Sequence, residues 1–289
     1  MNNSSITETT TPNHHPPRRN KRRWFIFTIA FISLILVGWQ TVSNNLHLDP
    51  DHLPLTTADY IGYAVCHRIT DRSFAIAGRQ LPLCARCTGM YLGFAFTFLP
   101  LILAGRRRWA SYPHWSIGLF LLGLIAIMGF DGLNSYSHFF ANTPRLYTPS
   151  NELRLLTGMG TGLAMGIGLF PALAETLWKD HQSQPILNWG ELISLIFLLI
   201  VVTIAVLSNQ PVVLYVMALV SALGLIIILT SLNMIFLMIA LAWDAQATRW
   251  QQLILPIMGG LLITITQIAL IDYIRYSLTG TLTGIPGLQ

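Results

Sequence analysis

All three cysteines of the 289-residue chain lie in one short segment, together with a histidine. They are Cys66, Cys84 and Cys87, and His67 directly follows the first of them. Cys84 and Cys87 have the C-x-x-C spacing that metal sites and thiol-exchange sites share. Three thiols and one imidazole form a ligand set that tetrahedral zinc favours. This segment is therefore the first place to look for a function.

Three kinds of chemistry fit these residues. The first is a metal site, zinc being the expected ion, built from Cys66, His67, Cys84 and Cys87. The second is a membrane thiol–disulfide oxidoreductase, in which Cys84 and Cys87 react, Cys66 resolves the intermediate, and a quinone accepts the electrons. The third is a structural disulfide with one spare thiol, in a non-enzymatic assembly or interaction protein. The sequence leaves open whether the chain is an enzyme, a transporter or a scaffold.

Four arginines surround the cysteines, whereas the same stretch carries a single aspartate. They are Arg68, Arg72, Arg79 and Arg86. The guanidinium group offers a planar fork that suits carboxylates and phosphates. We therefore expect a pocket for an anionic group, from either an anionic lipid or a small molecule. Contact with the bulk of the lipid headgroups is the alternative explanation of this charge.

The elements that position these residues are expected to be membrane-spanning helices. The chain is 53% hydrophobic and only 10% charged, against about a quarter charged in soluble domains. This composition predicts an all-α polytopic bundle that contacts the lipid bilayer, with roughly 20 residues per span. Seven spans are predicted, at 24–42, 84–104, 115–134, 153–177, 190–208, 211–243 and 252–275. The sixth is long for a bilayer, so it must tilt, extend beyond it, or break near Thr230, Ser231 and Asn233.

Basic residues predict how the bundle is oriented. Residues 1–23 are polar and end in a basic cluster, which indicates a disordered cytoplasmic tail; a cleaved signal peptide is the alternative. An N-terminus inside makes 43–83 an extracytoplasmic loop, followed by spans two to four in 84–177 and spans five to seven in 178–289. Because topology already explains the basic cluster, nucleic-acid binding has no support.

The start of the second span is expected to carry the C-x-x-C pair. Pro82 suits the first turn of a helix, which would place Cys84 and Cys87 on one helical face. The positive end of the helix dipole and Arg86 should then lower the pKa of these two thiols.

Small residues recur every four positions in two of the predicted spans. They are Ala85, Gly89 and Gly93 in the second span, and Gly158, Gly162 and Gly166 in the fourth. Such stripes allow helices to approach closely in lipid, so we expect these spans to pack together or share a neighbour. Arg154 lies one turn before the fourth-span stripe, and a buried arginine needs a partner. Asp131 is the expected partner, forming an intramembrane polar pair near the cysteines, and Glu152 is the local alternative.

The cysteine segment also resembles a known signature. Its runs Cys66-His67-Arg68 and Gly78-Arg79-Gln80-Leu81-Pro82-Leu83-Cys84-Ala85-Arg86-Cys87-Thr88-Gly89 are similar to an uncharacterised family of bacterial membrane proteins, catalogued as a domain of unknown function, number two thousand eighty-five. Asp131 and Arg154 fall in later runs that also resemble it, and the match covers roughly residues 60–170. The resemblance implies a bacterial plasma-membrane protein and groups these residues into one unit. It implies no activity.

Overall fold

The computed structural model of the chain describes residues 53–138 and 146–281. Its helices are α2 (Leu53–Val65), α3 (Ala85–Leu103), α4 (Trp115–Ser137), α5 (Asn151–Leu177), α6 (Trp189–Leu207), α7 (Pro211–Ala240) and α8 (Ile254–Thr279). Short elements are the 3-10 turns η1 (Thr70–Arg72) and η2 (Trp250–Leu253), and the strands β1 (Ala75–Ile76), β2 (Arg79–Gln80), β3 (Trp109–Ser111) and β4 (Gln182–Pro185). The predicted tail 1–23 and first span 24–42 lie outside the described residues.

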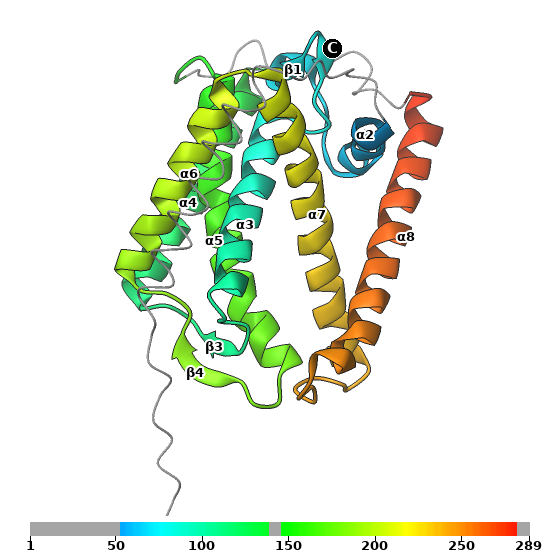
Figure 1. Cartoon of the computed structure of the whole chain (residues 1–289). Helices are drawn as coiled ribbons and strands as arrows, with labels where there is room; N and C mark the ends of the chain where they lie inside the picture. Colours follow the sequence, from blue (N-terminus) through cyan, green and yellow to red (C-terminus); the bar gives the residue numbers. More distant parts are fainter. Residues whose placement is uncertain (1–52, 139–145, 282–289) are drawn as a thin grey trace, which may run out of the picture.

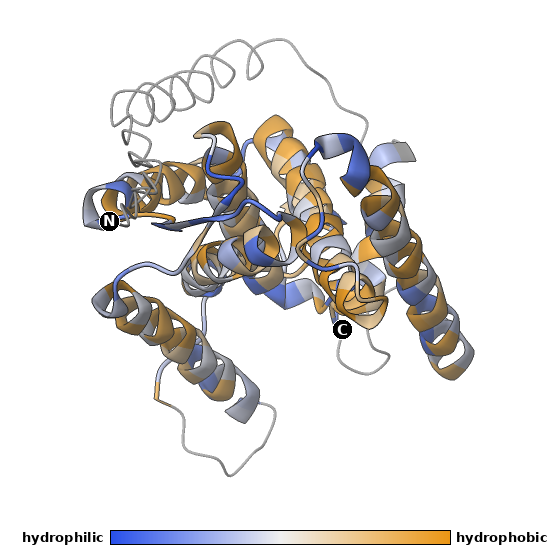
Figure 2. Cartoon of the chain, turned by 90° about the horizontal axis from the view of Figure 1, so that it is seen from below, coloured by the Kyte–Doolittle hydropathy of each residue, from blue (hydrophilic) through white to orange (hydrophobic). Residues whose placement is uncertain are grey.

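Six long apolar helices, α3 to α8, confirm the predicted all-α polytopic bundle. Each is long and apolar enough to cross a membrane, the last counted together with η2. They run alongside one another, with α2 and β1 at one end of the bundle and β3 and β4 at the other (Figure 1). Hydrophobic residues recur along all of them (Figure 2). Many of their large apolar side chains are exposed on the outside of the bundle, as contact with lipid requires. We call the end with α2 the cysteine end.

The sixth predicted span is one helix. α7 continues unbroken through 30 residues. Two of the polar residues that suggested a break, Thr230 and Asn233, instead bond to α8. Asn233 Nδ2 donates to Thr264 Oγ1 at 2.9 Å and to Gln267 Oε1 at 2.8 Å. Because the side chains bond across to the neighbouring helix, the backbone of α7 keeps its own hydrogen bonds.

Helices α3 and α5 pack directly on each other at the centre of the bundle, as the two stripes of small residues predicted. A Cβ atom added at Gly158 would clash with the carbonyl oxygen of Arg86, and one at Gly162 with that of Met90. The fit is reciprocal, because Gly89 meets the backbone of Leu155 in the same way. The absence of side chains here allows the two backbones to touch.

The predicted loop before the second span contains more regular structure than expected. Leu53 and Pro54 begin α2, and β1 pairs antiparallel with β2, Ala75 opposite Gln80. The N–H of Leu81 still bonds to the carbonyl of Phe74 in this hairpin at 3.0 Å. This bond delays the start of α3. The helix therefore begins at Ala85, with Cys84 as its N-cap, and not at Pro82 as predicted.

Candidate functional site

The three cysteine sulfurs converge at the cysteine end of the bundle. Within the described part of the chain, the ligand atoms of Cys66, Cys84 and Cys87 all lie within 4.8 Å of one another. All three are free thiols. Cys66 follows α2, whereas Cys84 and Cys87 belong to the start of α3. Two chain segments that are apart in the sequence thus build one sulfur cluster.

Close backbone contacts hold Cys66 in this position. Gly62 of α2 lies against the carbonyl of Pro82, where any Cβ atom would clash. The N–H of Cys66 continues the helical pattern by donating to the carbonyl of Gly62 at 2.9 Å. From the other side, Arg275 of α8 donates to the carbonyl of Cys66 at 2.6 Å. The first and last described helices therefore both fix the sulfur cluster.

The sulfur of Cys66 is in contact with several hydrogen-bonding groups. The backbone N–H of Cys84 donates to Cys66 Sγ at 3.3 Å, and His67 Nδ1 lies 3.5 Å from the same sulfur. Hydrogen bonds from the thiols of Cys84 and Cys87 lower the pKa of Cys66 well below its usual value, although burial opposes this. Interaction with Cys66 and then Cys84 raises the pKa of His67 to about 9. Both shifts arise from the close contacts of the Cys66 sulfur with Cys84, Cys87 and His67.

Of the four predicted metal ligands, the structure brings the three cysteine sulfurs together. His67 is half-buried beside Cys66 and is not among the ligand atoms that lie within 4.8 Å of one another in the described residues. Directly after it, Arg68 has a φ of 49°, a left-handed conformation. The chain therefore turns sharply at the end of the Cys66-His67-Arg68 run.

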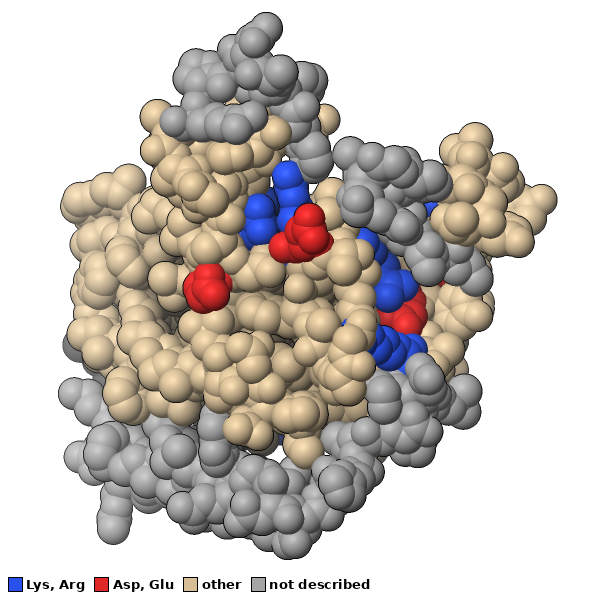
Figure 3. Space-filling model, turned by 90° about the horizontal axis from the view of Figure 1, so that it is seen from above, with Lys and Arg blue, Asp and Glu red and all other residues tan. Residues whose placement is uncertain are grey.

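The four arginines do not form the single pocket that the sequence predicted. Arg68 and Arg79 share the carboxylate of Asp59 on α2, at 2.8 and 2.7 Å, and line a cavity of about 340 Å³. Arg72 and Arg86 lie toward α4, where both donate to Ser135. The basic residues on this end of the molecule accordingly form separate groups (Figure 3). The reason is local, because the β1–β2 hairpin directs Arg79 toward α2 while η1 directs Arg72 toward α4.

The predicted ion pair between Asp131 and Arg154 is wrong. Asp131 Oδ2 instead pairs with Arg86, and its Oδ1 accepts a hydrogen bond from the Tyr147 hydroxyl at 2.8 Å. Arg154 donates to Asn151 Oδ1, one turn earlier in its own helix, at 2.8 Å. Asp131 was unavailable because side chains from α3 and from the segment before α5 already satisfy both of its oxygens.

Sequence reasoning missed Tyr147 and Ser135, whose roles depend on the fold. Tyr147 lies just before α5, and its carbonyl accepts from Asn134 Nδ2 at 3.0 Å. Burial, followed by its bond to Asp131, raises the pKa of the Tyr147 hydroxyl. No spacing in the sequence connects these residues to the cysteines.

Two archaeal proteins and one family model match the region that contains this site. An uncharacterized protein of Methanothermobacter thermautotrophicus is 32% identical over 105 residues, which are 36% of this chain and 82% of the relative. An uncharacterized protein of Methanocaldococcus jannaschii is 27% identical over 119 residues, 41% of this chain and 69% of the relative. The model of the predicted membrane proteins DUF2085 matches residues 66–168. The chain belongs to the DUF2085 family. No solved structure matches it.

The DUF2085 match begins at Cys66 and ends within α5. It includes every residue of the sulfur cluster as well as Asp131 and Arg154. Helices α6 to α8 lie beyond it. Because the two relatives are archaeal, the bacterial plasma membrane expected for this DUF2085 protein stays a prediction.

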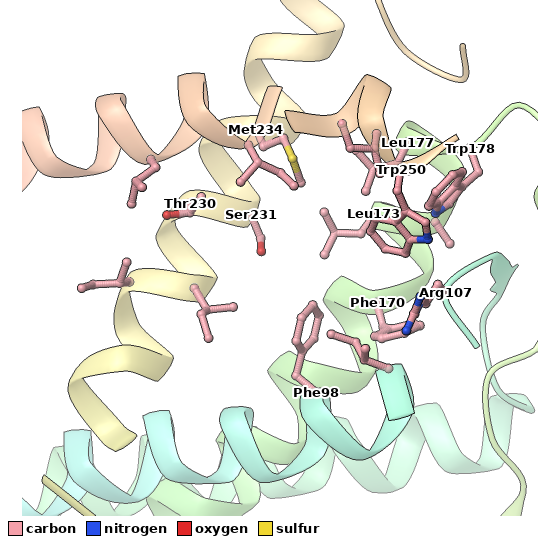
Figure 4. Close-up of a pocket in the computed structure, with 17 residues that line it drawn as sticks. Phe98, Arg107, Phe170, Leu173, Leu177, Trp178, Thr230, Ser231, Met234 and Trp250 are labelled. Atoms are coloured by element: carbon pink, nitrogen blue, oxygen red, sulfur yellow. The ribbon is translucent and has the colours of Figure 1, made fainter. Parts of the chain in front are cut away.

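A separate apolar cavity lies toward the opposite end of the bundle. It has a volume of about 330 Å³, and side chains from α3, α5, α7 and α8 line it, among them Phe98, Phe170, Ser231 and Met234 (Figure 4). Arg107 and the indole of Trp250 also line it. This cavity faces the β3–β4 end, whereas the thiols occupy the cysteine end. It therefore offers no place for a quinone beside the sulfur cluster.

Proposed function

We propose that this multi-pass membrane protein holds a zinc-type metal ion at the cysteine end of its bundle. The single observation that supports the proposal is the mutual proximity of the three sulfurs, all within 4.8 Å. Zinc binds sulfur at about 2.3 Å, so two sulfurs on one tetrahedral ion lie about 3.8 Å apart. The cluster of Cys66, Cys84 and Cys87 has that scale without the bonds of a disulfide.

His67 is the residue that would complete the set. Its Nδ1 atom lies 3.5 Å from Cys66 Sγ, so a small change of the ring could bring a nitrogen to the same ion. Three soft sulfurs and one imidazole favour zinc among the common metals. The N–H of Cys84 that donates to Cys66 Sγ would orient this sulfur toward the ion.

The ion would act as a clamp between α2 and the start of α3. Its role is structural, or activating for a reaction at this end of the bundle. The positive-inside rule supports an extracytoplasmic position, because Arg106, Arg107, Arg108, Lys179 and Arg249 lie toward the opposite end. Most arginines of the cysteine end are instead held by carboxylates or carbonyl groups.

Burial favours a metal site over thiol exchange. Cys66 and Cys84 are only 2% and 3% exposed, whereas cysteines that exchange disulfides with a partner are partly exposed. The apolar cavity lies at the end opposite the cysteines, so it does not support electron transfer from the thiols to a quinone. Two buried cysteines beside a half-buried third one suit the enclosed ligand set of a structural zinc site.

The test is the zinc content of the full-length protein purified in detergent. We expect about one equivalent in the wild type and less than about 0.2 equivalents in Cys84→Ser. His67→Ala should bind zinc more weakly, whereas His181→Ala, which changes an exposed histidine at the opposite end, should keep the full equivalent. A wild-type protein without zinc, whose cysteines react with maleimide only after reduction, would overturn the metal site and favour the oxidoreductase.

A further inference from the structure

Arg154 is a buried arginine with no carboxylate partner in the described structure. It is only 7% exposed, and within the described residues its guanidinium group makes one hydrogen bond, to the neutral amide of Asn151. Its Nε atom is buried without any partner. An arginine removed from water normally requires an opposite charge nearby. The structure therefore provides a buried cation that no carboxylate of the described residues contacts directly.

The nearby carboxylates do not fill this role. Both oxygens of Asp131 are taken, one by Arg86 and one by Tyr147. Asp71 and Glu152 are exposed, and neither pairs with Arg154. The Nε atom of Arg86 is also buried without a partner. Among the described residues, the Nε atoms of both Arg86 and Arg154 are thus buried donors without an acceptor.

Arg72 adds a third positive charge to the same group. Arg72 Nη2 donates to the carbonyl of Ser135 at 3.1 Å, and Arg86 Nη2 donates to the hydroxyl of Ser135 at 3.2 Å. Burial, and then the charges of Arg154 and Arg86, lower the pKa of Arg72. Ser135 holds the side chains of Arg72 and Arg86 together, and Asn151, which accepts from Arg154, also donates to the carbonyl of Asp71 beside Arg72. An anion among these positive groups would relieve their mutual repulsion.

Two helices also direct their positive ends at this group. Arg86 is the second residue of α3, and Arg154 is the fourth residue of α5. The two helices start at the same end of the bundle, and the first turn of α3 lies against α5 beyond Arg154, because Gly158 touches the backbone of Arg86. Helix N-termini carry partial positive charge and attract oxyanions.

We propose that Arg72, Arg86 and Arg154 form a binding site for a phosphate group. Phosphate offers more oxygens and more negative charge than a carboxylate, which suits three guanidinium forks and two helix N-termini. The group could belong to a lipid headgroup, since the site lies at one end of a membrane bundle, or to a free phosphate compound.

The first experiment measures thermal unfolding of the full-length protein in detergent during titration with inorganic phosphate, against chloride at equal ionic strength. A ligand that binds only the folded state raises the midpoint of unfolding. We expect such a rise for the wild type with phosphate and none with chloride. Arg72→Gln should weaken the apparent affinity at least about tenfold, as the loss of a charged contact implies. Arg72 lies in η1, outside the spans, so this variant should still fold.

Arg79→Gln is the matched control, because it removes an arginine from the other group at the same end of the bundle. It should leave the phosphate affinity within about twofold of the wild type. Arg154→Lys, which keeps the charge but loses the fork, should fall between the wild type and Arg72→Gln. The proposal is overturned if Arg79→Gln abolishes the response as strongly as Arg72→Gln does.

A second arm identifies the source of the phosphate. Short-chain phosphatidylglycerol is titrated in parallel with a glycerol lipid that lacks phosphate. An Arg72-dependent rise in the midpoint with phosphatidylglycerol alone would assign the site to a lipid headgroup, and a rise with inorganic phosphate would assign it to a free compound. If neither raises the midpoint above its matched control, the site does not exist. None of these readouts needs zinc, so the metal proposal and this one can fail separately.

Discussion

At the scale of single residues, Arg86 connects the sulfur cluster to the rest of the bundle. It lies between Cys84 and Cys87 in the sequence, and its guanidinium group pairs with Asp131 of α4. The pair is unequal, since the side chain of Asp131 is 2% exposed and that of Arg86 is 22% exposed. If the pair were broken, the Arg86 guanidinium group could be solvated, whereas the Asp131 carboxylate would stay buried.

Replacing Asp131 should show how much the Arg86–Asp131 ion pair stabilises the bundle. Asp131→Asn leaves Arg86 without its charge partner and Tyr147 with a weaker acceptor. We expect a loss of about 1–3 kcal/mol in the free energy of unfolding, less than for a fully buried pair because Arg86 reaches solvent. Unfolding of the purified protein in detergent measures this loss.

The matched control is the exposed pair of Arg108 and Asp180, whose side chains are 39% and 55% exposed. Asp180→Asn should change the free energy of unfolding by less than about 1 kcal/mol. Equal effects of the two substitutions would mean that the Asp131 pair does not stabilise the bundle.

At the scale of elements, the contact between α3 and α5 sets the position of the functional residues. Helix α3 carries Cys84 at its N-cap and Arg86 in its first turn, and α5 carries Arg154. The glycines at this contact replace side-chain packing by direct backbone contact. A change of spacing here would move all these groups relative to one another.

A methyl group at Gly162 should therefore be costly. Gly162→Ala places a Cβ against the backbone of Met90, so the helices must separate. Overpacking of this kind costs about 1–3 kcal/mol, and zinc content and phosphate response should fall with it. Gly123→Ala in α4 is the control, because nothing lies within 4 Å of its added Cβ. It should stay within about 1 kcal/mol of the wild type, as measured by the same unfolding experiment.

At the scale of the whole molecule, the bundle has two chemically different ends. Cysteines and paired arginines gather at one end, and the β3–β4 pair with the buried Arg106–Glu191 ion pair lies at the other. A single orientation in the membrane would place every functional group proposed here on one side. The basic residues predict that this side is extracytoplasmic.

Labelling in intact cells tests this orientation. In a variant whose three native cysteines are replaced by serine, Gln210→Cys places an exposed thiol in the turn before α7, at the cysteine end. Asp180→Cys places one at the opposite end. A membrane-impermeant maleimide should label position 210 and leave position 180 unlabelled until the cells are lysed. The reverse pattern would put the sulfur cluster in the cytoplasm.

Properties that depend on local sequence could be predicted, and six of the seven expected spans correspond to helices of the described chain. Hydrophobic length determines a span because the bilayer core has a constant thickness. The pairing of α3 with α5 was also predictable, because small residues every four positions define one helical face. The short segment that contains the cysteines predicted that they would lie near one another, whereas the contact of Gly62 with Pro82 and the bond from Arg275 fix Cys66 beside the other two.

Only the tertiary structure decided which charged groups meet. The four arginines near the cysteines divide between Asp59 and Ser135, and Asp131 pairs with Arg86 instead of Arg154. These pairings depend on the rotation of each helix about its axis and on the direction of the β1–β2 hairpin. Both result from the combined energy of many weak contacts. The combined energy of these contacts cannot be read from residue types and their spacing. The chain by itself therefore determined which residues carry chemistry, and folding determined which of them act together.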